Sequence, residues 1–182
     1  MKLYNLIILM IFWTFAINAE EITITFNNES VKYWGYISDR TMGGVSNGQA
    51  LLDQDGDIKF ARLTGNVSTD NNGGFIQLRS TLSFANLNSI NTNLQGVRIK
   101  TRGNNETYHI FIRTSETQSY RDFYYATFVA KDKWKIIDLP FTKFKHRFYN
   151  KALDGNDIRT FAIVAYGRDF TSDVSVSEII FY

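Results

Sequence analysis

Hydrophobic and polar residues alternate along most of this chain, so that apolar side chains recur at every second position. Tyr108, Ile110 and Ile112, for example, alternate with His109, Phe111 and Arg113. The same pattern appears in residues 22–26, 97–102, 123–129, 161–165 and 179–181. These segments are short and rich in β-branched and aromatic residues, and a period of two in such segments predicts β-strands.

Clusters of glycine, asparagine and aspartate separate the alternating segments. They occur at residues 43–44, 47–48, 55–56, 72–74, 103–105 and 154–156. Such clusters are typical of turns, and strands that follow one another every 8–12 residues or so favour an antiparallel β-sandwich or jelly roll. Residues 84–90 and 141–144 are expected to form short helices. The sequence therefore predicts an all-β protein.

The first nineteen residues have the pattern of a secretory signal peptide. Lys2 supplies a positive charge, residues 6–17 are apolar except for Thr14, and Ala19 provides a small residue before a proposed cleavage site. The apolar run is shorter than the roughly 20 residues that cross a bilayer. We expect residues 1–19 to be removed and residues 20–182 to form one exported domain, periplasmic or secreted, without an integral membrane segment. A membrane anchor or a buried first helix is the alternative.

The composition narrows the class of partner. Removal of 19 residues from 182 leaves 163, which is enough for one domain with one core. The loss of Lys2 leaves 19 of the 20 basic side chains against 18 acidic ones, and a net charge near zero argues against nucleic acid as a partner. The chain has no cysteine, so its stability must come from packing instead of disulfides.

Three longer motifs occur in a fixed order. Ser-Asp-Arg-Thr-Met-Gly-Gly-Val-Ser spans residues 38–46, Asn-Asn-Gly-Gly-Phe spans 71–75 with an arginine close behind, and a Trp precedes Pro-Phe-Thr-Lys-Phe within 134–144. Together with the aromatic and arginine-rich segments between them, they resemble the complex I intermediate-associated protein 30 family over nearly all of residues 20–182. Two steps depart from that family's pattern: a Phe-x-Gly strand motif is lengthened to Phe60…Gly65, and Gly103-Asn104-Asn105 replaces the usual Gly-Asp-Gly turn.

The resemblance implies a galactose-binding-like jelly roll. It also implies a non-catalytic role, because members of the family act as assembly chaperones for respiratory complex I and plant relatives assist photosystem biogenesis. An exported protein does not reach the matrix or cytoplasmic arm of complex I, so the fold transfers more directly than the role. We expect a non-catalytic binding module with a protein partner, chaperone-like or an assembly factor. A carbohydrate-binding module is the alternative.

Two glycine-rich segments are candidates for binding a ligand or partner. Their candidate residues are Asp39, Arg40, Met42, Gly43, Gly44 and Ser46 in the first segment and Asn71, Asn72, Gly73 and Gly74 in the second. Free backbone N–H groups beside glycines, a guanidinium fork and a hydroxyl suit a polar ligand or a peptide. The alternative is that both segments are structural turns, since Gly-Gly and Asp commonly encode backbone geometry.

Basic and aromatic side chains provide further candidates. Arg79, Arg98, Lys100, Arg102 and Arg113 are candidates for a basic strip that meets an anionic ligand, an acidic partner or a phospholipid surface. Arg98, Lys100 and Arg102 must share one face of their strand, and a solvated face is the alternative reading. Tyr120, Tyr124, Phe148 and Tyr149 are candidates for an aromatic platform for sugars, with a place in the core as the alternative.

Catalytic and cofactor motifs are lacking in the sequence. His109 and His146 have no neighbouring ligand pattern, and there is no Gly-x-Ser-x-Gly elbow or phosphate-binding glycine loop. Residues 53–57 resemble the start of a calcium loop, but an acidic hairpin turn explains them better. We expect no enzyme activity, no metal and no cofactor, although two carboxylates brought together by folding, as in a glycosidase, stay open.

Overall fold

A computed structural model describes residues 21–80 and 94–182 and consists of two antiparallel β-sheets. The first sheet has the order β3-β4-β12-β6-β9, with β1 paired to β12. Its strands are β1 (Ile22–Thr25), β3 (Asn47–Asp55), β4 (Ile58–Val67), β6 (Gly96–Gly103), β9 (Lys135–Pro140) and β12 (Phe170–Phe181). The signal peptide and the helix predicted at residues 84–90 lie outside the described residues.

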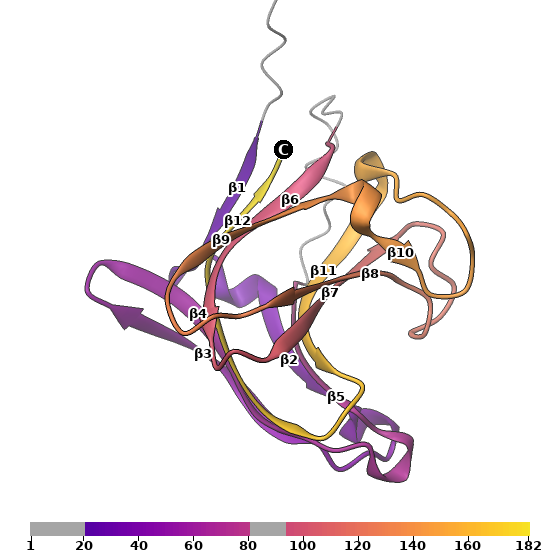
Figure 1. The fold of residues 1–182 in the computed structure, drawn as a ribbon, viewed down its shortest axis with the longest axis horizontal. Coiled ribbons are helices and arrows are strands. Elements are labelled where there is room, and N and C mark those ends of the chain that lie inside the picture. The colour runs from indigo at the N-terminus through magenta and orange to yellow at the C-terminus, as the bar shows by residue number, and fades with distance from the viewer. Residues whose placement is uncertain (1–20, 81–93) are drawn as a thin grey trace, which may run out of the picture.

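The second sheet has the order β10-β8-β7-β11-β5-β2. Its strands are β2 (Trp34–Ser38), β5 (Phe75–Ser80), β7 (Thr107–Thr114), β8 (Tyr124–Val129), β10 (Lys145–His146) and β11 (Ile158–Tyr166). Figure 1 shows the first sheet at the left and the second sheet at the centre and right. This is the antiparallel jelly-roll sandwich that the alternating pattern predicts.

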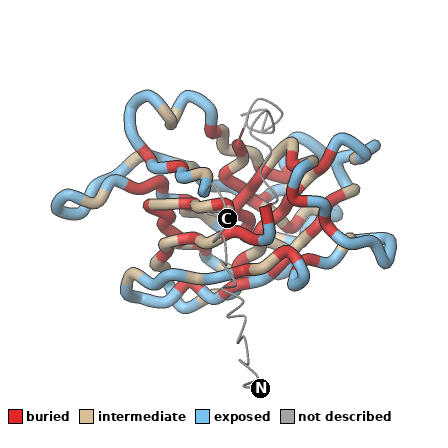
Figure 2. Tube along the Cα trace, turned by 90° about the horizontal axis from the view of Figure 1, so that it is seen from above, coloured by how far each residue is buried: buried red, intermediate tan, exposed pale blue. Residues whose placement is uncertain are grey.

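The main core lies between the two sheets. The inward-facing residues of β7, which are Tyr108, Ile110 and Ile112, are fully buried there. Phe161 and Ile163 of β11 meet them from the same sheet, and the first sheet supplies Val97, Ile99, Val174, Val176, Ile179 and Phe181. In Figure 2 the central strands are buried and the connecting loops are exposed. The observed burial thus follows the predicted period of two.

The connections are turns and short 3-10 helices. The helices are η1 (Val31–Tyr33), η2 (Asp39–Met42), η3 (Asp70–Asn72), η5 (Phe141–Lys143) and η6 (Gly155–Asp157). Helix η5 confirms the prediction for residues 141–144. Residues 53–57 form the hairpin between β3 and β4, where Gly56 adopts a positive φ of 59°. Within the described ranges, no helix has the length and apolar character to span a membrane.

A second, smaller hydrophobic cluster lies on the outer face of the second sheet. Phe111, Phe123, Ala162 and Val164 are buried in it, and Phe75, Tyr125 and Tyr166 pack against it. Because Phe111 alternates with the inward-facing Ile110 and Ile112, its ring must point away from the main core. The second sheet is therefore covered with apolar side chains on both faces.

Candidate binding groove

A groove of about 820 Å³ lies over this outer face. It is lined by Ile37, Thr41, Met42, Asn71, Asn72, Gly73, Phe75, Gln77, Arg79, Phe111, Arg113, Tyr120, Arg121, Phe123, Arg147 and Tyr166. In Figure 1 the segments that carry Met42 and Gly73 lie together at the lower right, and the loops after β7 and β10 lie at the upper right. The groove thus reaches from one group of loops to the other across β5, β11 and β7.

The strand register determines which side chains meet on the groove floor. Ala162 of β11 is paired with Arg79 of β5 on one side and with Phe111 of β7 on the other. Two residues further along β11, Val164 is paired with Gln77 and with His109. Residues paired in this way project to the same face of a sheet. The floor therefore combines aromatic rings with polar side chains.

The aromatic part of the floor is tightly packed. The rings of Phe111 and Phe123 are stacked with centroids 3.9 Å apart, and Tyr166 meets Phe111 edge-on at 5.2 Å. Phe111 and Phe123 are buried, whereas Tyr166 is half-buried and Tyr120 at the rim is 56% exposed. Tyr166 and Tyr120 are thus the tyrosines of the groove lining, and both are partly uncovered.

Arg113 is the most buried cation of the groove. Its Nη2 atom donates a hydrogen bond to the carbonyl oxygen of Tyr120 at 2.9 Å, while its Nη1 atom is buried without a partner. Burial, and next the nearby charge of Arg79, lower the pKa of Arg113 to about 10, although Asp122 acts in the opposite direction. Burial also lowers the pKa of Arg79. Both guanidinium groups are still charged at neutral pH.

The carboxylate of Asp39 joins the two glycine-rich segments. It is fully buried and accepts hydrogen bonds from the N–H and hydroxyl of Ser46 at 3.0 and 2.5 Å. It also accepts from the N–H groups of Gly74 and Phe75, at 2.6 and 3.1 Å. The predicted loop and the predicted turn therefore converge at one end of the groove, with Asp39 as their internal anchor.

The glycines of these segments make room for Asp39. A Cβ atom on Gly44 would lie 2.4 Å from Cγ of Asp39, and a Cβ atom on Gly73 would lie 2.5 Å from Oδ2. Gly43 and Gly74 adopt positive φ angles of 89° and 120°. Asp39, Gly43, Gly44, Ser46 and Gly74 thus shape the backbone, whereas Met42, Asn71, Asn72 and Gly73 line the groove. Arg40 is exposed and lies outside the groove lining.

Arg98 and Arg102 do not join Arg79 and Arg113, so the five-residue basic strip does not form. Both lie on β6, which belongs to the other sheet. Arg98 lies 3.5 Å from Glu21 and 3.7 Å from Asp138.

Arg102 pairs with Asp55 at 2.5 Å, and its guanidinium carbon lies within 5.0 Å of the ring centroids of Phe60 and Trp134. Lys100 lies between these two arginines on the same face of β6. This face has the character of a charge-balanced surface.

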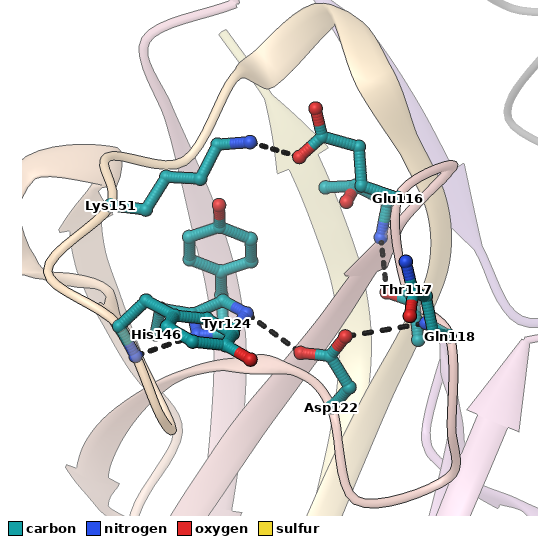
Figure 3. A pocket seen from close by; sticks show the side chains of 9 residues that line it. Glu116, Thr117, Gln118, Asp122, Tyr124, His146 and Lys151 are labelled. Atoms are coloured by element: carbon teal, nitrogen blue, oxygen red, sulfur yellow. Dashed lines mark hydrogen bonds and ion pairs between the residues drawn. The ribbon is translucent and has the colours of Figure 1, made fainter.

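A pocket of about 430 Å³ lies next to the other end of the groove (Figure 3). Nε2 of His146 lies 2.7 Å from Oδ1 of Asp122, and Nδ1 of His146 accepts hydrogen bonds from the N–H groups of Phe148 and Tyr149. Figure 3 also shows Lys151 and Glu116 pointing toward each other above Tyr124. The His146–Asp122 contact links the two loops that carry Arg121 and Arg147.

The aromatic platform is only partly exposed. Tyr120, Phe148 and Tyr149 are exposed, by 54% to 67%, but Tyr124 is buried in the core and its hydroxyl donates to the carbonyl oxygen of Ala152. Sequence reasoning missed Phe111, Phe123, Tyr166, Arg121 and Arg147 as groove residues. The outward phase of β7, in which aromatic and basic side chains alternate with the core residues, would have pointed to Phe111.

Two antiparallel sheets with short connections define a galactose-binding-like jelly-roll sandwich. The sequence model of the complex I intermediate-associated protein 30 family matches residues 24–172, so this chain belongs to that family. The resemblance identified from the motifs is thereby confirmed. A search of curated protein sequences finds no significant match.

Several solved structures share the fold. The family 11 carbohydrate-binding module of a cellulosomal cellulase of Clostridium thermocellum superimposes with a TM-score of 0.68 at 15% identity, covering 90% of this chain and 94% of that one. The same kind of module in complex with a β-1,3-1,4-mixed-linked tetrasaccharide gives 0.66 at 15% identity, over 88% and 94%. The K2 cleaved adhesin domain of Lys-gingipain gives 0.52 at 12%, over 90% and 99%. At these identities the similarity establishes the fold.

Proposed function

We propose that this protein is a non-catalytic carbohydrate-binding module that holds an oligosaccharide segment in the groove over the second sheet. The observation that carries the proposal is the combination of aromatic rings with unpartnered polar groups on one groove floor. Sugar rings have apolar faces and polar edges, and aromatic residues with a polar tip suit such ligands. The groove volume of about 820 Å³ lies within the range of roughly 300–1,000 Å³ that is usual for ligand pockets.

Gln77 supplies the clearest hydrogen-bonding group. Its side chain is 4% exposed, and Oε1 is buried without a partner. A buried amide oxygen without a hydrogen bond is unfavourable by about 1–3 kcal/mol, and a sugar hydroxyl can satisfy it. Asn71 and Asn72 add exposed amides at the end of the groove, where both adopt positive φ angles. The groove therefore offers donors and acceptors around an aromatic floor.

The shared fold adds support at a coarser level. A relative by fold binds a tetrasaccharide, and it is a carbohydrate-binding module. The leader pattern of residues 1–19 supports export of the protein, and polysaccharides are abundant outside the cytoplasm. On that ground we propose that the protein acts in the periplasm or outside the cell.

A protein-binding, assembly-type role is the second candidate. Family membership over residues 24–172 favours it, because the family is named for association with an assembly intermediate. This role requires a protein partner recovered from the native envelope. In contrast, the carbohydrate proposal requires binding of a purified glycan in the absence of any other protein.

The carbohydrate proposal is tested with a glycan array followed by calorimetric titration of the best oligosaccharide. Gln77→Met removes both hydrogen-bonding atoms at nearly constant size, and we expect it to weaken binding at least tenfold with little change in the melting temperature. Gln49→Met is the matched control, because Gln49 is exposed on β3 of the other sheet. The proposal fails if no glycan binds, or if Gln77→Met binds as well as the unmodified protein.

A further inference from the structure

We infer that the saccharide bound in this groove carries an anionic substituent, the carboxylate of a uronic acid or a sulfate ester, which Arg79 and Arg113 bind. This inference rests on the proposed carbohydrate-binding function and specifies its ligand. Both substituents present coplanar or near-tetrahedral oxygens that accept paired N–H donors from a guanidinium fork.

The fold places the two arginines on either side of β11. Arg79 is paired with Ala162 and Arg113 is paired with Thr160, so both side chains project over the outer face of the sheet. They are close enough for the charge of Arg79 to lower the pKa of Arg113. Two half-buried cations of like charge repel each other, and an anion between them relieves that repulsion.

Ion pairing with carboxylates distinguishes the arginines of the groove from most other arginines of the described residues. Among the described residues, Arg62, Arg98, Arg102, Arg159 and Arg168 each lie within 4 Å of a carboxylate. Of the other arginines, Arg79, Arg113, Arg121 and Arg147 line the groove, and Arg40 does not. Paired arginines are absent from the lining, which contains neither aspartate nor glutamate. Four of the five described arginines that lack a carboxylate within 4 Å therefore line this one groove.

The carboxylate of Asp122 lies near the groove arginines, but its contacts are with other residues. Asp122 lies 2.7 Å from Nε2 of His146 through Oδ1, and its Oδ2 accepts a hydrogen bond from the N–H of Gln118 at 3.2 Å. These contacts hold Asp122 toward the neighbouring pocket, so Nη1 of Arg113 keeps no partner. Asp122 stays near enough for its charge to act on Arg113, but it leaves Nη1 without a hydrogen bond, and that donor is available to an anion.

Phe123 supports two of the guanidinium groups. The guanidinium carbons of Arg113 and Arg147 lie 5.9 and 5.2 Å from the centroid of its ring. Cations over an aromatic ring are held by its negative face. The contact with Phe123 occupies no N–H group, and Nη1 of Arg113 stays without a protein partner. The arginines are thus positioned before a ligand binds, which limits the entropy lost on binding.

The test compares acidic oligosaccharides with neutral counterparts of the same backbone, by calorimetry at about 0.15 M salt. The pairs are tetragalacturonate with its fully methyl-esterified form, and a κ-carrageenan tetrasaccharide with its desulfated form. We expect at least one acidic member to bind tenfold or more tightly than its neutral partner, and the pair that responds identifies carboxylate or sulfate. Arg113→Gln and Arg79→Gln should each weaken that binding at least tenfold.

Arg62→Gln is the matched control, because Arg62 lies on β4 of the other sheet in a two-bonded pair with Asp173. It should leave the affinity for the acidic ligand unchanged. Arg113→Gln breaks no ion pair but loses the hydrogen bond to the carbonyl oxygen of Tyr120, so we expect the melting temperature to fall by no more than about 4 °C. The melting temperature of each variant thus separates loss of binding from loss of folding. Equal binding of acidic and neutral members, or of the arginine variants and the unmodified protein, overturns the inference. If Gln77→Met still weakens binding of neutral glycans in that case, the proposed carbohydrate function stands.

Discussion

Asp39→Asn is expected to lower the melting temperature by on the order of 10 °C. The buried carboxylate accepts hydrogen bonds from three N–H groups and one hydroxyl, which belong to Ser46, Gly74 and Phe75. Asparagine keeps the shape but has one acceptor oxygen, so its NH₂ group would face donors. Leaving such partners unsatisfied costs about 3–5 kcal/mol, and 1 kcal/mol shifts the melting temperature of a domain of this size by roughly 2–4 °C.

Asp70→Asn provides the matched control. Asp70 begins η3, next to the turn that Asp39 anchors, and is exposed. The same chemical change there should alter the melting temperature by less than about 2 °C. Differential scanning calorimetry measures both variants. If the two variants melted alike, Asp39 would not be the anchor that joins the loop at residues 39–46 to the turn at residues 71–74.

Gly65→Ala is expected to destabilise the first sheet by about 2–4 kcal/mol. A Cβ atom there would lie 2.1 Å from the carbonyl oxygen of Asn47 and 2.5 Å from Cα of Gly48, across the β3–β4 pair. Gly65 also has a φ of 151°, which residues other than glycine rarely adopt. The new methyl group must push β3 away from β4. Urea denaturation measures the resulting loss in the free energy of unfolding.

Gly35→Ala is the control for this substitution. Gly35 lies within β2, its φ is not positive, and a Cβ atom there would meet nothing within 4 Å. Alanine should therefore stabilise the protein slightly, by about 0.4–1 kcal/mol, through the unfolded chain. Equal midpoints for Gly65→Ala and the unmodified protein would show that β3 tolerates the methyl group and that the close strand contact is not needed.

The sequence predicts the fold well because the alternation of apolar and polar residues matches the alternation of inward-facing and outward-facing side chains in the strands. Ile110 and Ile112 face the core as their alternation requires, and the short helix expected at residues 141–144 appears as η5. The resemblance to the family is also confirmed, since it depends on motifs that follow one another in a fixed order along the chain. These features are local, and local patterns are what a single sequence records.

The groove depends on strand pairing, which the sequence does not record. Arg79 and Arg113 are 34 positions apart, and β11 lies between their strands only in the folded sheet. Arg102, although only 11 positions before Arg113, belongs to the other sheet. The basic strip predicted from sequence is therefore divided between the sheets: Arg98 and Arg102 pair with carboxylates on the first sheet, whereas Arg79 and Arg113 have no carboxylate partner on the second. Asp39 shows the same limit, because its partners Gly74 and Phe75 come from another segment.

The central claim is that the groove on the outer face of the second sheet is the binding site. It is tested most directly by amide chemical-shift mapping of the labelled protein during titration with the tightest-binding oligosaccharide. We predict that the largest shifts cluster at Gln77, Arg79, Phe111, Arg113 and Tyr166, and that β3 and β4 are unaffected. Shifts that cluster on the first sheet, or no shifts at saturating oligosaccharide, would contradict the account.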